Sequence, residues 1–101
     1  MSRRLEFHQI LIDTSGVKNV YFQPPETVKM NYPAIIYSRS SVNARHANNE
    51  LYKRRQAYRV IVVDSDPDSE IPDKISQLPL CRFESHYTAD NLNHDVFNIF
   101  Y

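Results

Sequence analysis

The stretch Tyr58-Arg59-Val60-Ile61-Val62-Val63 decides the fold that the sequence predicts. It contains four consecutive β-branched residues, the densest apolar run in the chain. A run without polar alternation suits a strand that is covered on both faces better than an exposed edge strand. We therefore expect residues 58–63 to form the central strand of a sheet.

An acidic segment, residues 64–70, follows this strand directly. Its hydroxyl and carboxylate side chains favour turns and helix caps, so the strand should stop near Val63 and a helix can begin around Ser69. The series of acids also resembles the start of a calcium-binding loop. That loop needs a glycine at its bend and a glutamate at its twelfth position, where this segment has no glycine and has Ile75. Turns and caps are therefore the preferred interpretation.

Before the central strand, the pattern predicts one helix and two strands. Residues 3–13 carry an imperfect apolar stripe that is typical of a helix, with Ser2 as a possible cap. Gly16 stands where a helix C-terminus favours a left-handed residue. Residues 17–22 are expected to form a strand that the following prolines stop, and residues 31–38 form the next one.

After the acidic segment, the pattern predicts a second helix with Pro72 in its first turn and Pro79 at its end. Its apolar face would consist of Ile71, Ile75 and Leu78. Two further strands should follow. In residues 81–86, Cys81 and Phe83 alternate with Arg82, Glu84 and His86, so the two sets should lie on opposite faces.

The last segments complete the predicted sheet. Residues 87–93 are expected to form a connection, with one possible helical turn capped by Thr88, and residues 96–101 a ring-rich strand. The predicted fold is a single α+β domain over residues 1–101. It has a small mixed or antiparallel sheet, helices packed on one face, and a long hairpin arm.

Composition narrows the class of protein. The chain has 101 residues, and its 12 Lys and Arg balance its 12 Asp and Glu, so no overall field draws it to nucleic acid. A domain this small buries a limited fraction of its surface and often gains stability from association. One cysteine excludes an internal disulfide and fits a reducing compartment. With no long apolar run, we expect a soluble protein without membrane partners.

The basic arm, residues 39–55, is the candidate contact surface. Its predicted interface residues are Arg39, Arg45, Tyr52, Lys53, Arg54 and Arg55. These side chains could bind phosphates, since cations beside aromatic rings are typical of nucleic-acid contacts. They could instead contact a neighbouring subunit or protect an exposed strand pair from aggregation. The second interpretation is preferred because the chain is neutral overall.

Catalytic chemistry is not expected from this sequence. One glycine cannot build a phosphate-binding loop or a nucleophile elbow. Cys81 with His86 or His94 as its base is conceivable, but Cys81 lies in an apolar alternation typical of a packed, inert cysteine. His86, Asp90, His94 and Asp95 form a cluster without recognisable zinc spacing, so hydrogen-bonded structural histidines are the preferred interpretation. We expect no cofactor and no metal.

Four segments of the chain resemble one known family of proteins. The segments are Asn19-Val20-Tyr21-Phe22-Gln23-Pro24-Pro25, Lys29-Met30-Asn31-Tyr32-Pro33-Ala34-Ile35-Ile36-Tyr37, Tyr58-Arg59-Val60-Ile61-Val62-Val63-Asp64-Ser65-Asp66-Pro67-Asp68-Ser69 with Ile71-Pro72, and His86-Tyr87-Thr88-Ala89-Asp90-Asn91-Leu92-Asn93-His94-Asp95-Val96-Phe97. Together these segments resemble the small neck proteins of tailed bacteriophages, and most of all the tail terminators. They cover most of the chain, while residues 38–56 stand outside the resemblance.

The resemblance implies a structural protein of the virion, which would be made in the host cytoplasm. Tail terminators are α+β domains that form a ring, usually a hexamer, on the last ring of the tail tube and offer a surface to the head connector. The implied partners are further copies of the chain, the tail tube protein, a head connector or head completion protein, and DNA passing through the lumen. Two alternatives stay open: another neck protein, or a small nucleic-acid-binding regulator that uses the basic arm.

Overall fold

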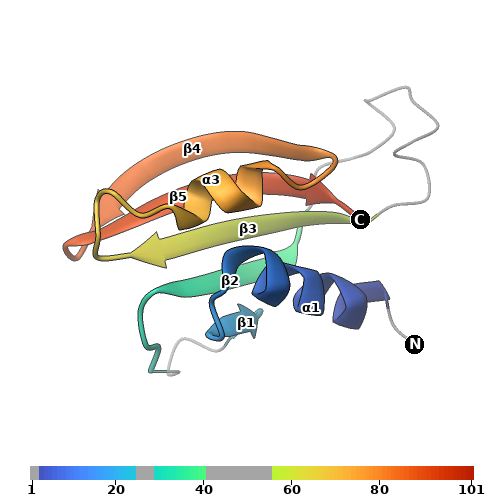
Figure 1. Ribbon diagram of the computed structural model, residues 1–101, viewed down its shortest axis with the longest axis horizontal. Helices are drawn as coiled ribbons and strands as arrows, with labels where there is room; N and C mark the ends of the chain where they lie inside the picture. Colours follow the sequence, from blue (N-terminus) through green and yellow to red (C-terminus); the bar gives the residue numbers. More distant parts are fainter. Residues whose placement is uncertain (1–2, 25–28, 41–55) are drawn as a thin grey trace.

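The computed structural model describes residues 3–24, 29–40 and 56–101, which form a five-stranded open sheet with two helices (Figure 1). The elements in chain order are α1 (Arg3–Ser15), β1 (Val20–Phe22), β2 (Ala34–Arg39), β3 (Ala57–Asp64), α3 (Ile71–Ser76), β4 (Cys81–Ala89) and β5 (Leu92–Phe100). The strand order is β1-β2-β3-β5-β4. β1 and β2 are parallel, and the other pairs are antiparallel, so the sheet is mixed.

β3 is the central strand, as the sequence predicts. It pairs with β2 on one side and with β5 on the other. Successive side chains of a strand point to opposite faces, and Val60 and Val62 belong to the core cluster that includes the buried residues of both helices. Ile61 and Val63 therefore point to the other face. Both helices lie on one side of the sheet in Figure 1, which confirms the predicted arrangement.

Aromatic rings join α1 to the sheet. The fully buried ring of Phe7 stacks on Tyr58 of β3, with ring centroids 4.7 Å apart, and on Tyr101, 5.3 Å away. It also meets the ring of Tyr37 of β2 edge-on at 5.6 Å. From α3, Ile75 is fully buried, while Ile71 and Leu78 pack against the same core. The three residues of the predicted apolar face therefore contact the core as expected, although Leu78 lies beyond the helix, which ends at Ser76.

The end of α1 has the left-handed residue that the sequence predicts. Gly16 has a φ of 75°, and its N–H donates to the carbonyl of Ile12 at 2.8 Å. The hydroxyl of the buried Ser15 donates to the Leu11 carbonyl at 2.6 Å and accepts from the N–H of Val17 at 3.0 Å. These bonds satisfy backbone groups that a helix end leaves unpaired, and the helix runs to residue 15 instead of 13.

Several predicted boundaries are wrong. β1 begins at Val20 instead of residue 17, because Val17 is buried in the core from the turn after α1. β2 begins at Ala34 instead of residue 31, after the cis peptide bond that precedes Pro33. α3 begins at Ile71, and its N-cap Glu70 makes no side-chain cap bond. Ser69 instead accepts the N–H of Ile71 at 3.3 Å.

α3 also ends earlier than predicted. Its last residue is Ser76, so Pro79 lies beyond the helix in the segment that leads to β4. The C-cap Gln77 is right-handed and donates its N–H to carbonyls of the last turn. The positive φ of 57° falls on Leu80, directly before β4. The predicted cap Ser2 lies outside the described residues.

The predicted connection at residues 87–93 is wrong, because this segment belongs to a hairpin. β4 continues to Ala89 and β5 starts at Leu92, leaving only Asp90 and Asn91 between them. Both turn residues have positive φ, 53° and 63°. Asp and Asn are the residues besides glycine that tolerate this conformation, and a two-residue turn of this kind matches the twist of the paired strands.

A β-bulge overturns the predicted alternation in β4. The register against β5 shifts between Phe83 and Ser85, so Phe83 lies opposite Phe97 while His86 lies opposite Asp95. Phe97 and Asp95 point to the same face of β5, which places His86 with Phe83 instead of opposite it. Phe83 is also not buried beside Cys81: 56% of its surface is exposed.

Candidate interaction surface

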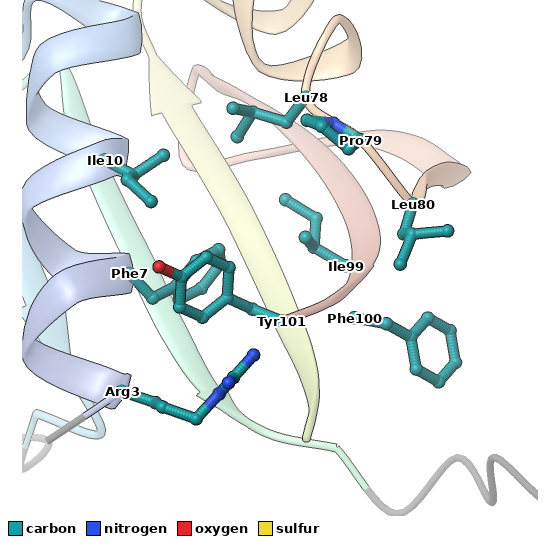
Figure 2. Close-up of a pocket in the computed structure, with 9 residues that line it drawn as sticks. All are labelled: Arg3, Phe7, Ile10, Leu78, Pro79, Leu80, Ile99, Phe100 and Tyr101. Carbon is teal, nitrogen blue, oxygen red and sulfur yellow. The ribbon is translucent and has the colours of Figure 1, made fainter. Parts of the chain in front are cut away.

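A pocket of about 270 Å³ lies where the start of α1, the segment after α3 and the end of β5 meet (Figure 2). Its lining residues are Arg3, Phe7, Ile10, Leu78, Pro79, Leu80, Ile99, Phe100 and Tyr101. Most of these side chains are apolar, and Arg3 is the only charged one. Sites for cofactors and drug-sized ligands usually measure about 300 to 1,000 Å³. This pocket therefore suits a single large apolar side chain better than a cofactor.

Arg3 brings a positive charge to the pocket. Its guanidinium lies 5.1 Å from the centre of the Tyr101 ring, a cation–π distance. The Tyr101 hydroxyl donates to Oε2 of Glu6 at 3.3 Å, so this carboxylate contacts the ring's polar end. Within the described ranges, no carboxylate lies at ion-pair distance from Arg3. The guanidinium can therefore accept an additional anionic partner.

β4 forms one edge of the sheet. It pairs only with β5, and no strand of the described residues pairs with its other side. Phe83 is held by an edge-on contact with Phe97, with centroids 5.5 Å apart, and Tyr87 is 43% exposed. Edge strands offer unpaired N–H and carbonyl groups, while charges and bulges hinder regular pairing with another strand. Arg82, Glu84 and the bulge at residues 83–85 therefore favour contacts through side chains on this edge.

The face of the sheet that points away from α1 and α3 carries cations and rings. Arg59 and Arg82 are exposed and lie opposite Asn98 of β5 from its two sides. Further along the same face, the rings of Tyr87 and His94 stack at 4.6 Å with an interplanar angle of 9°. This face combines positive charge with a stacked aromatic pair.

The predicted histidine cluster is only partly assembled. Nδ1 of His86 lies 2.7 Å from Oδ1 of Asp95, a hydrogen bond between β4 and β5. His94 points to the other face, and Asp90 lies in the hairpin turn. In residues 3–24, 29–40 and 56–101, no group of three or more His, Cys, Asp or Glu side chains is arranged to hold a metal ion.

The side chain of Cys81 packs against the core, and its thiol is not activated as a nucleophile. Burial raises the pKa of this thiol to about 11, so the thiol stays protonated near neutral pH. His86 is five residues further along the same strand, which corresponds to about 16 Å at ~3.3 Å per residue. His86 therefore cannot take the proton of this thiol directly.

The acidic segment after β3 makes turns, as the sequence predicts. Oδ1 of Asp64 accepts the N–H of Asp66 at 3.0 Å, and Oδ1 of Asp66 accepts the N–H of Asp68 at 2.9 Å. Such bonds to the backbone two residues further on are typical of turn-forming aspartates.

A polar cluster links α1 to β2. The hydroxyl of the buried Tyr37 lies 2.7 Å from Nδ1 of His8, and Nη1 of Arg4 donates to the same hydroxyl at 3.4 Å. Burial and the neighbouring Arg4 charge lower the pKa of His8. Burial raises the pKa of Tyr37, against the opposing effect of Arg4. The cluster positions α1 over β2.

Of the predicted interface residues, the structure places only Arg39. Its side chain is exposed at the end of β2, and its N–H donates to Oε1 of Gln23 at 3.3 Å. The others lie outside the described residues: Arg45, Tyr52, Lys53, Arg54 and Arg55. Sequence reasoning missed Arg3 and Phe83 as surface candidates. The sequence carried no signal for the exposure of Phe83, because its alternation with Arg82 and Glu84 is equally typical of a residue on the buried face of a strand.

Comparisons with known proteins assign this chain neither to a family nor to a function. A scan against protein-family models and searches of curated proteins and of solved structures gave no match. In the described residues, neither helix has the length and apolar character needed to cross a membrane.

Proposed function

We propose that this chain is a structural subunit of a tailed-phage virion, which forms a ring at the end of the tail tube and joins it to the head connector. The observation that carries the proposal is the resemblance to tail terminators of residues 19–25, 29–37, 58–69 with 71–72, and 86–97. A hexamer is the ring size that this resemblance implies. The partners would be the tail tube protein, a head connector or head completion protein, and DNA in the lumen.

Three surface features support a role in assembly. The β4 edge has no strand partner in the described part of the chain. More than half of the surface of Phe83 is exposed. An apolar pocket has the positively charged Arg3 among its lining residues. Exposed rings and apolar pockets are frequent at protein interfaces. A ring forms when each subunit offers different surfaces to its two neighbours and the rotation closes.

A phage that lacks this gene tests the proposal. We expect filled heads and separate tails that fail to join, and tails of variable length, in electron micrographs of the lysate. Supplying the intact protein in trans should restore joined particles. Complete, infectious particles made without the protein would overturn the proposal.

A nucleic-acid-binding role is the second candidate, favoured by the helix-free face of the sheet. Arg59 and Arg82 are exposed there, on the same face as the Tyr87–His94 ring pair. Cations with stackable rings suit single-stranded nucleic acid. Binding of a labelled oligonucleotide that weakens steeply with salt, and that is lost in Arg59→Ala/Arg82→Ala, would favour this role. Another neck position, such as head completion, would show instead as loss of DNA from filled heads.

A further inference from the structure

Two features leave apolar surface that the other described residues do not cover. The first is the apolar pocket with Arg3 among its lining residues. The second is Phe83, a residue that is 56% exposed although it belongs to a strand that borders the core. An exposed phenylalanine leaves apolar surface in water, which costs free energy unless a partner covers it.

The charges beside these two features include one opposite pair, Arg3 and Glu84, whereas Arg82 on the other side of Phe83 lies on the opposite face of the sheet, across from Asn98. Arg3 has no ion-pair partner among the described carboxylates, and Glu84, next to Phe83, has none among the described cations. A phenylalanine followed by a glutamate matches an apolar pocket that carries an arginine. Both halves of the match are on this chain, so the partner that it defines is a second copy.

We propose that the pocket of one copy receives the Phe83 side chain of a second copy, and that Glu84 of the second copy pairs with Arg3. This contact deepens the proposed ring and rests on it, because it names the surfaces through which neighbouring subunits meet. The donor surface, Phe83 and Glu84, differs from the acceptor surface, the pocket. Each subunit can give one contact and receive one, and a ring forms when the giving and the receiving neighbours are different copies.

The structure of β4 favours this mode over pairing of strand edges. The bulge at residues 83–85 breaks the regular spacing of backbone groups, and Arg82 and Glu84 place charges beside it. Both features hinder the addition of another strand. They do not hinder insertion of one projecting ring, which requires only a pocket of matching size and polarity.

Sedimentation velocity over a range of concentrations tests the contact. Phe83→Ser removes the donor ring, and we expect association to weaken by about 30-fold, the loss typical of a central anchor residue. Tyr87→Ser is the matched control, because Tyr87 is an exposed ring of the same strand outside the proposed contact. Tyr87→Ser should associate like the wild type. Unchanged melting temperatures would show that both variants fold.

Charge exchange tests the ionic part. Glu84→Arg and Arg3→Glu should each weaken association, and the double variant should recover much of it, because the pair is restored with reversed signs. A double variant no stronger than the single variants would overturn the pairing of Glu84 with Arg3.

Mixing two defective variants tests the direction of the contact. Ile10→Trp fills the pocket but keeps Phe83, whereas Phe83→Ser keeps the pocket but lacks the ring. At concentrations where the wild type associates but a contact weaker by about 30-fold does not form, each variant alone should be monomeric, and an equimolar mixture should form a 1:1 dimer that grows no further. A mixture that stays monomeric would overturn the proposal, as would a wild-type chain that is monomeric throughout.

Phage complementation separates this inference from the proposed function. If Phe83→Ser associates normally in solution while the deleted gene abolishes head–tail joining, the contact is wrong and the function stands. If the contact is confirmed in solution but a phage that lacks the gene still yields complete particles, the proposed function is wrong and the self-association stands.

Discussion

The hydroxyl of Tyr37 lies 2.7 Å from Nδ1 of His8, a hydrogen bond that ties α1 to β2. Nη1 of Arg4 donates to the same hydroxyl at 3.4 Å. His8 therefore lies beside a permanent positive charge, which disfavours a second proton on the imidazole ring.

This geometry predicts a loss of stability in mild acid. Burial and the Arg4 charge lower the pKa of His8 below 6.5 in the folded chain, so the unfolded chain binds more protons at that site. The free energy of unfolding should therefore decrease as the pH falls below 6.5. His8→Gln does not titrate, and its urea-unfolding free energy should depend less on pH between 7 and 5.5. Equal slopes for both proteins would contradict the assignment.

The ring contacts of Phe7 predict a large effect of its truncation. Phe7→Ala removes a fully buried ring that stacks on Tyr58 and Tyr101, and we expect a loss of about 3–5 kcal/mol in unfolding free energy. Leu5→Ala on the same helix is the control, because Leu5 is half exposed and should change stability by about 0.5 kcal/mol or less. Urea denaturation measures both, and similar values for the two variants would show that α1 does not pack as described.

The turn at Asp90 and Asn91 predicts a strong dependence on residue type. Asn91→Val places a β-branched side chain at a φ of 63° and should cost about 1–2 kcal/mol. Asn91→Gly accepts this φ without strain and should stay close to the wild type. Thermal unfolding followed by circular dichroism distinguishes the two. Equal destabilisation by both changes would argue that the Asn91 side chain, and not its backbone, matters.

Cys81 predicts a slow thiol reaction. With a pKa of about 11, only on the order of one thiol in a thousand is ionised at pH 8. Reaction with Ellman's reagent should therefore be slower by about 100-fold or more in the folded chain than in the same chain unfolded in urea. Because the folded pKa is raised, the stability that the buried neutral thiol contributes is lost only as the pH rises from 9 toward 11. Equal rates in both states would show an exposed cysteine.

The sequence predicts the parts of this fold that depend on dense apolar runs. Val60 and Val62 lie in the core of a central strand, and Ile75 lies on the buried face of its helix, as their spacing indicates. Such apolar side chains are buried in the core whatever the order of the strands, so the pattern alone predicts their burial. The position of Gly16 after α1 is predicted for a different reason: a positive φ at a helix end is a local property of the backbone.

The candidate surface depends on relationships that spacing does not reveal. Phe83 resembles a core residue by alternation, and only the bulge and the edge position of β4 leave it exposed. Arg3 and Tyr101 meet although they are almost the whole chain apart in sequence. The interface predicted for Arg39 and the other cations of the basic arm remains a prediction, because residues 41–55 lie outside the described residues.

The short turn between β4 and β5 also has a consequence for how the chain reaches its fold. The nine-residue strands of this hairpin meet through neighbouring sequence, so their pairing closes a very small loop, whereas β3 must find β5 across the acidic segment, α3 and β4. Isolated hairpins form in about 1–10 μs, and long-range pairing is slower because more chain entropy is lost first. We expect the hairpin to act as a template on which β3 adds, followed by β2. Pulse-labelling hydrogen exchange should then protect the amides of β5 that face β4 before those of β2, and simultaneous protection would indicate a single concerted step.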